Sequence, residues 1–120
     1  MKILIVDDDA LTRLALHRLL TDCGWHVITA TNGEEAYDLM QREEAARLVI
    51  IDWVMPGMSG PELQRELKLR EQSIPIVFIT AQRDATVRPR LIAEGAVECL
   101  FKPFDATDLL QALNTALGVG

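Results

Sequence analysis

Five polar residues in this sequence lie at the ends of short apolar runs. Asp7 and Asp8 follow KILIV, Asp52 follows RLVII, Thr80 follows PIVFI and Lys102 follows VECLF. Three carboxylates within a few ångströms repel one another, so an ionised cluster needs a compensating cation, and oxygen ligands favour a hard ion such as Mg²⁺. With a lysine cation and a threonine donor added, the set suits an anionic oxygen group, most simply a phosphoryl group bound to or transferred onto one carboxylate.

These side chains can meet only if the runs before them are strands of one sheet. Five short runs rich in Val and Ile are predicted strands, at residues 2–6, 25–29, 47–51, 75–79 and 97–101. Three of them are almost unbroken apolar sequence, which predicts strands buried on both faces. The segments between them have helical spacing, shown by Leu11, Leu14, Ala15 and Leu19 in the first segment and by Leu63 and Leu67 in the third.

Capping residues indicate where the helices begin and end. Asp9 is a predicted cap for the first helix and Gly24 a predicted end for it. Pro61 suits a first helical position, Gly95 follows a helical segment, and Asp105 precedes the last helix. The sequence therefore alternates strand and helix throughout.

Five β-α units predict the α/β fold class, with a parallel five-stranded sheet covered by helices on both faces. Right-handed crossovers leave few topologies, and the flavodoxin-like, doubly wound (βα)5 sandwich with strand order 2-1-3-4-5 is the leading one. Ligands of such sheets bind beyond the carboxyl ends of the strands, beside strands one and three. That edge is where the five polar residues lie, and the chain is expected to form one domain over residues 1–120.

Composition argues against several kinds of partner. The net charge is −6 and basic residues do not cluster, so we expect no direct nucleic-acid binding by this domain. No apolar run approaches the roughly 20 residues of a membrane span, so we expect no membrane contact and a soluble, cytoplasmic protein.

Cys23 and Cys99 lack the spacing of a metal motif, which favours two buried free thiols over a disulfide or a metal pair.

Four motifs, ILIVDD, VIIDWVMPGMSG, IPIVFITA and GAVECLFKPF, resemble in order and spacing the receiver domain of bacterial two-component response regulators. The resemblance covers essentially residues 2–117. It implies that Asp52 is the phosphoacceptor and becomes 4-aspartylphosphate. It also implies that Asp8, Asp52 and the backbone carbonyl of Val54 ligate Mg²⁺, while Asp7 holds a metal-bound water.

The same resemblance assigns roles to the other strand ends. Thr80 would be the switch hydroxyl that binds the phosphoryl group, Lys102 would pair with that group, and the Lys102-Pro103 peptide would be cis. Receivers commonly carry an aromatic switch residue where this sequence has Cys99, which we interpret as a small buried hydrophobe rather than a redox sensor. Residues two beyond the acceptor and two beyond the threonine, here Val54 and Gln82, would govern how water reaches the acyl phosphate.

The implied partners are a sensor histidine kinase or a histidine phosphotransfer protein as donor, and an effector that the sequence does not specify. Phosphorylation would shift a two-state surface around the fourth helix, fifth strand and fifth helix, with homodimer formation as a further possibility. The domain would not be an enzyme beyond its own phosphorylation and dephosphorylation. Met1 lies close to the first strand, which favours an amino-terminal or solitary placement, and an output domain beyond residue 120 stays open.

Simpler interpretations compete for each residue. Asp9 is best interpreted as a helix cap only. Taken singly, Asp52 could be a turn residue, Thr80 could be a strand-end hydroxyl and Lys102 could be a surface charge. The joint placement of Asp52, Thr80 and Lys102 favours a functional site.

Two other functions are alternatives. One is a Mg²⁺-dependent aspartyl phosphatase, but such enzymes usually carry an acid where this chain has Val54. A non-phosphorylated, receiver-like binding module is another, and it would be expected to lack an acceptor or an acid.

The fourth helical segment contains a proline, Pro89. Inside a helix it would cost about 3 kcal/mol or more, whereas in a first turn it costs little. We therefore expect a short regular helix beginning near Arg88 or Pro89. Residues 82–87 would then form an irregular, mobile extension of the preceding loop, with Arg88 and Arg90 free to meet a partner.

Overall fold

The computed structural model describes residues 2–42, 46, 48–52, 74–81, 85–93 and 95–118, except for the side chains of residues 41 and 42. Its elements in chain order are β1 (Lys2–Val6), α1 (Ala10–Asp22), β2 (His26–Ala30), α2 (Gly33–Arg42), β3 (Leu48–Asp52), β4 (Ile76–Thr80), α4 (Val87–Ala93), β5 (Glu98–Phe101) and α5 (Ala106–Ala116). The predicted third helix, with Pro61 at its start, lies outside the described residues. Within the described ranges, no helix has the length and apolarity needed to cross a membrane.

The five strands form one sheet in the order β2-β1-β3-β4-β5, and every neighbouring pair is parallel. This confirms the flavodoxin-like topology. The predicted ends of three strands move by one residue, to Ala30, Asp52 and Thr80. Asp52 pairs with Ile79, and Thr80 pairs with Phe101. Both polar residues are thus the last members of their strands, which fixes their backbones in the hydrogen-bonded ladder.

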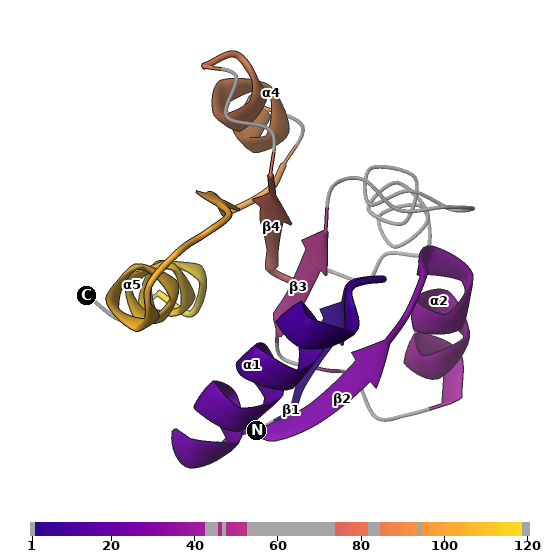
Figure 1. The fold of residues 1–120 in the computed structure, drawn as a ribbon. Helices are drawn as coiled ribbons and strands as arrows, with labels where there is room; N and C mark the ends of the chain where they lie inside the picture. The colour runs from indigo at the N-terminus through magenta and orange to yellow at the C-terminus, as the bar shows by residue number, and fades with distance from the viewer. Residues whose placement is uncertain are drawn as a thin grey trace.

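Helices cover both faces of the sheet, with α1 and α5 on one side and α2 and α4 on the other (Figure 1). Successive strand residues point to opposite faces, so the central strands contribute alternately to the two cores. Ile50 packs in the core under α1 and α5, whereas Val49 and Ile51 pack in the core under α2 and α4. All five residues of β3 and all five of β4 are buried, as the unbroken apolar runs predicted.

The first helix differs from its predicted pattern in one respect. Leu16 and Leu20 are its fully buried residues, while Leu11 is 77% exposed and Leu14 is 49% exposed. The leucines of this helix are spread over more than half of its circumference. Their spacing therefore predicts a helix but does not show which side of it packs against the sheet. The exposed pair leaves an apolar surface on α1, Leu11 and Leu14, beside the carboxyl end of the sheet.

Most helix boundaries are as predicted. The Asp9 carboxylate accepts hydrogen bonds from the Leu11 amide at 3.0 Å and the Thr12 hydroxyl at 2.8 Å, which caps α1. Gly24, with φ of 91°, follows the last turn of that helix, where a side chain would be strained. At the other end of the chain, Asp105 caps α5 by accepting from the Asp108 amide at 2.8 Å.

The fourth helix is short and begins one residue before the predicted start. Ala85 and Thr86 form a turn, and α4 has seven residues from Val87. The Arg90 amide donates to the Thr86 carbonyl at 3.3 Å, so Pro89 occupies the third helical position, where an amide would have no acceptor within the helix. Proline therefore removes no helical hydrogen bond there. Residues 82–84 of the predicted loop extension lie outside the described residues.

The prediction that Arg88 and Arg90 are free for a partner is wrong, because both already interact within the domain. The Nη2 and Nε atoms of Arg88 donate to Glu98 Oε1 at 2.6 and 2.9 Å, which joins α4 to β5. Glu98 Oε1 also accepts from the Cys99 amide at 3.0 Å. The sequence did not reveal this pair because its two members are ten residues apart on different elements.

Candidate functional site

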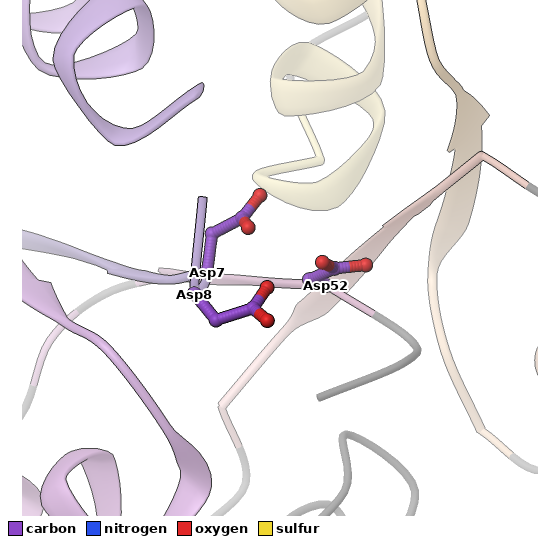
Figure 2. Close-up of side chains that lie close together, drawn as sticks. All are labelled: Asp7, Asp8 and Asp52. Carbon is purple, nitrogen blue, oxygen red and sulfur yellow. The ribbon is translucent and has the colours of Figure 1, made fainter. Parts of the chain in front are cut away.

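The predicted acidic group is present at the carboxyl edge of the sheet. Asp7, Asp8 and Asp52 each offer a carboxylate oxygen, and these atoms all lie within 4.8 Å of one another (Figure 2). The arrangement follows from the sheet, because β1 and β3 are neighbours with Val6 paired to Ile51. The residue that follows each of these partners is an aspartate.

Burial differs among the three carboxylates. Asp7 is fully buried, Asp52 is 8% exposed, and Asp8 is exposed. A buried carboxylate without partners would be costly, because burial disfavours its charged form. The site therefore has two carboxylates inside the protein and one at its solvent opening.

Asp7 obtains its partners from several parts of the chain. Its Oδ1 accepts from the Asp9 amide at 2.9 Å, and its Oδ2 accepts from Lys102 Nζ at 3.0 Å. Its own amide donates to the Ala30 carbonyl of β2 at 3.1 Å, and its carbonyl accepts from Arg13 Nη1 at 2.7 Å. Asp7 is consequently fixed in position at both its side chain and its backbone.

Lys102 brings a positive charge between two of the acids. Its Nζ lies 3.0 Å from Asp7 Oδ2 and 3.5 Å from Asp52 Oδ2. Burial alone would lower the pKa of Lys102, but the hydrogen bond to Asp7 and the charge of Asp52 outweigh it and raise that pKa. The ammonium is therefore charged at neutral pH. The Lys102 amide donates to the Thr80 carbonyl at 2.7 Å, and the predicted cis peptide before Pro103 is present.

Thr80 completes the set of strand-end residues. It is 1% exposed and is the last residue of β4. Since Asp52 pairs with Ile79, Thr80 lies one residue further along the neighbouring strand. The register thus brings Thr80 to the same edge as the acidic group, as the sequence predicted.

The donor set suits a hard divalent cation. Three carboxylates and one ammonium leave an excess of negative charge, and all the side-chain ligand atoms are oxygens, which Mg²⁺ prefers. Asp7, Asp8 and Asp52 are the described residues that would hold it. Val54, whose carbonyl was predicted as a further ligand, and Gln82 lie outside the described residues.

The two cysteines are both free, as predicted, but their surroundings differ. Cys99 is 3% exposed in the core shared with α4, which fits a small buried hydrophobe. Burial, followed by the charge of Glu98, raises the pKa of the Cys99 thiol to about 11. Cys23 is exposed, so its predicted burial is wrong. It is the C-cap residue of α1 and lies directly after the last helical residue, Asp22.

Sequence reasoning missed a groove beside the site. A hollow of about 590 Å³ lies between α1 and the segment that joins β5 to α5, with Leu11, Ala15, Phe104 and Ala106 among its apolar lining residues. Lys102 and Ala81 lie at its wall, so the groove reaches the functional edge of the sheet. The sequence offered no clear signal for this groove, because the spacing of the leucines in α1 does not show that Leu11 is exposed.

Fold and site together define a doubly wound α/β domain with an acidic, lysine-paired centre at the carboxyl edge of its sheet. The sequence model of one protein family, the response regulator receiver domain, matches residues 3–114 of this chain. The chain belongs to this family.

Curated relatives extend beyond the length of this chain. The probable transcriptional regulator ycf27 of Pyropia yezoensis is 39% identical over 116 residues, which is 97% of this chain and 47% of the relative. The phosphate regulon transcriptional regulatory protein PhoB of Rhizobium meliloti (strain 1021) is 34% identical over 118 residues, which is 97% of this chain and 52% of the relative. This chain therefore spans about half the length of these relatives.

Solved structures agree with the fold over nearly the whole chain. A response regulator receiver domain protein of Clostridium thermocellum superposes with a TM-score of 0.88 at 31% identity, covering 98% of this chain and 94% of that one. The chemotaxis protein CheY4 of Vibrio cholerae gives a TM-score of 0.87 at 32% identity, covering 97% of this chain and 98% of that one.

Proposed function

We propose that this domain accepts a phosphoryl group on Asp52 in a Mg²⁺-dependent reaction, with a sensor histidine kinase or a histidine phosphotransfer protein as the donor. The observation that carries the proposal is the lysine bridge: Lys102 Nζ lies between Asp7 and Asp52, at 3.0 and 3.5 Å, on the edge where Asp8 opens the site to solvent. A partly buried cation beside a nearly buried carboxylate suits an incoming phosphoryl group, because the cation is already in place to stabilise the negative charge of that group.

The transfer exchanges one bond for another. The Asp52 carboxylate attacks phosphorus, a phosphorus–oxygen bond forms, and the phosphorus–nitrogen bond of the donor phosphohistidine breaks, leaving its electron pair on the imidazole. No base is needed, because a carboxylate is already ionised at neutral pH. Lys102 would stabilise negative charge on the phosphoryl oxygens, and Thr80 would supply a hydroxyl donor. Asp7, Asp8 and Asp52 would hold Mg²⁺, which would supply further positive charge at the site.

The groove beside the site offers a docking surface for the donor protein. Its apolar lining runs from Leu11 and Ala15 of α1 to Phe104, and its wall includes Lys102. A helix that carries a phosphohistidine could bury Leu11, which is 77% exposed, and bring its imidazole to the edge that holds Asp52. This location supports a protein donor rather than a small substrate that needs no apolar contact.

Phosphorylation would then act on the α4-β5-α5 face. Thr80 ends β4, and the chain continues from it toward α4, so movement of its hydroxyl toward the phosphoryl group would pull on this segment. Cys99 would repack in the adjoining core. The effector, and any homodimer formed on phosphorylation, would recognise the changed face. The domain would act on no other substrate, so its output is a signal rather than turnover.

The test uses a small phosphodonor so that no partner protein is needed. Incubation with Mg²⁺ and acetyl phosphate should add one phosphoryl group, seen by intact mass and removed by hydroxylamine. Asp52→Asn should abolish the addition, whereas Asp22→Asn, at an exposed acid on the last turn of α1, should leave it unchanged. An unchanged label in Asp52→Asn would contradict the proposal, and so would continuous hydrolysis of a phosphomonoester by the wild type.

A further inference from the structure

Arg13 reaches back from α1 to the loop that carries the first two acids. It is the fourth residue of the helix, and its side-chain Nη1 donates to the Asp7 carbonyl at 2.7 Å. Its backbone amide donates to the Asp9 carbonyl at 3.0 Å. One residue of α1 therefore binds the β1-α1 loop both before and after Asp8.

The carbonyl that Arg13 holds determines the direction of the next residue. A peptide unit is planar, so the Asp7 carbonyl fixes the plane that runs to the Cα atom of Asp8. The Asp7 carboxylate has its own partners in the Asp9 amide and Lys102. The Asp8 side chain is exposed, so its direction relative to Asp52 depends on its backbone.

An arginine suits this position for two reasons. A guanidinium is always charged, and a hydrogen bond from a charged donor to a carbonyl is stronger than a neutral one. The three carboxylates nearby also favour a positive charge at the loop. Arg13 is partly buried, and its guanidinium binds the loop through the Asp7 carbonyl.

We propose that Arg13 is a positioning residue for the acidic group: by holding the Asp7 carbonyl it directs the Asp8 carboxylate toward Asp52 and so sets the affinity of the site for a divalent cation. The inference rests on the proposed Mg²⁺-dependent function. Two effects of removing Arg13 oppose each other. Loss of a nearby positive charge would strengthen cation binding, whereas a loosened loop would weaken it. The hydrogen bond to the loop makes the second effect the larger one.

The decisive measurement is Mg²⁺ binding, followed by NMR titration of the amide resonances with MgCl₂. Arg13→Met keeps the aliphatic stem but removes the donor and the charge, and should weaken Mg²⁺ binding about 10-fold, as loss of outer-shell partners of metal ligands does. Arg13→Lys restores a charged donor and should recover part of the affinity. Arg18→Met is the matched control, because it removes the same charge from an exposed position of the same helix and should leave the affinity unchanged.

Each other outcome is informative. Tighter binding in Arg13→Met would show that the guanidinium acts only as a competing charge, and equal binding would show that it does not position the loop; either result overturns the inference. Thermal unfolding without metal shows whether Arg13→Met folds. If it does not, the Mg²⁺ affinity of Arg13→Lys is the deciding measurement. An affinity equal to or tighter than that of the wild type would count against a positioning role for Arg13. Wild-type protein that binds no Mg²⁺ and takes no label on Asp52 would instead overturn the proposed function, and the inference with it.

Discussion

The β1-α1 corner and the α4-β5 face are built in opposite ways, although both adjoin the functional edge. At the corner, Asp7 is fully buried and is bound by β2, by its own loop, by α1 and by Lys102. At the face, the seven-residue α4 buries two side chains, Val87 and Leu91, and reaches β5 through the half-exposed Arg88–Glu98 pair. The corner is fixed by polar contacts from four parts of the chain, whereas the described part of α4 is one short helix that buries two apolar side chains.

The difference shows how one small domain can combine chemistry with a change of shape. Carboxylates that receive a cation and a phosphoryl group must be held in place before either arrives, because reorganising them during the reaction raises the barrier. A surface that reports the reaction must instead rearrange at low cost, and segments with few buried contacts open most easily. Four measurements would test this contrast, and they follow in order of expected effect.

The largest effect should come from matched leucines in the two regions. Leu16 of α1 is 2% exposed and Leu91 of α4 is fully buried. Leu16→Ala should lower the free energy of unfolding by about 3–5 kcal/mol, whereas Leu91→Ala should cost about 2 kcal/mol, because a short, lightly attached helix can relax around the cavity. Denaturant unfolding measures both. A Leu91→Ala cost equal to or above that of Leu16→Ala would show that α4 is as firmly held as α1.

The second-largest effect is expected in the reaction rates of the two cysteine thiols. Cys99 lies under α4 with a pKa raised to about 11, whereas Cys23 is exposed at the end of α1. A raised pKa leaves less thiolate at pH 8, and a shift of two pH units corresponds to a roughly 100-fold lower thiolate fraction. Cys99 is also buried whereas Cys23 is exposed, so a disulfide reagent should label Cys23 much faster than Cys99.

The same labelling also reports on the face itself. Phosphorylation should accelerate the reaction of Cys99 while leaving Cys23 unchanged, because movement of α4 uncovers the core beneath it. Cys23→Ser and Cys99→Ser assign each rate to its residue. If Cys99 reacts at the same rate with and without acetyl phosphate, the result would count against a movement of α4 that exposes Cys99 of β5.

A smaller effect is expected from the ion pair between α4 and β5. Arg88 is 50% exposed and Glu98 20% exposed, so solvent screens their attraction. A double-mutant cycle with Arg88→Met and Glu98→Gln should give a coupling of about 0.5–1 kcal/mol that falls in 1 M salt. A coupling well above 2 kcal/mol, insensitive to salt, would mean that this attachment is strong and would weaken the contrast with the corner.

The smallest effect is expected at the exposed acid of the corner. Asp8→Ala removes one of three repelling carboxylates, so the metal-free protein should become more stable by a few tenths of a kcal/mol. Mg²⁺ should stabilise the wild type but have little effect on the mutant, since binding to the folded state alone raises stability. Thermal unfolding with and without MgCl₂ measures both changes. Marked destabilisation of metal-free Asp8→Ala would show that Asp8 has a structural role.

Much of the candidate site could be predicted because it depends on strand ends. Unbroken apolar runs identified β1, β3 and β4, and a parallel sheet brings the carboxyl ends of neighbouring strands to one edge whatever the loops between them do. Asp7, Asp52 and Lys102 could therefore be placed together from the order of motifs alone. The caps Asp9 and Asp105 were equally predictable, since a cap acts within three residues of itself.

Other features were decided only when the elements packed. The face of α1 that enters the core, Leu16 and Leu20 rather than Leu11 and Leu14, depends on how the helix lies on the sheet, and a helix with leucines on several sides does not encode that choice. The Arg13 bond to the Asp7 carbonyl depends on how α1 leaves the β1-α1 loop.

The Arg88–Glu98 pair likewise needs α4 to lie beside β5. The physical reason is the range of each interaction. Hydrophobic periodicity and capping are local and can be read along the chain, whereas a hydrogen bond or ion pair between side chains on different elements forms only where three-dimensional packing brings donor and acceptor within about 3 Å.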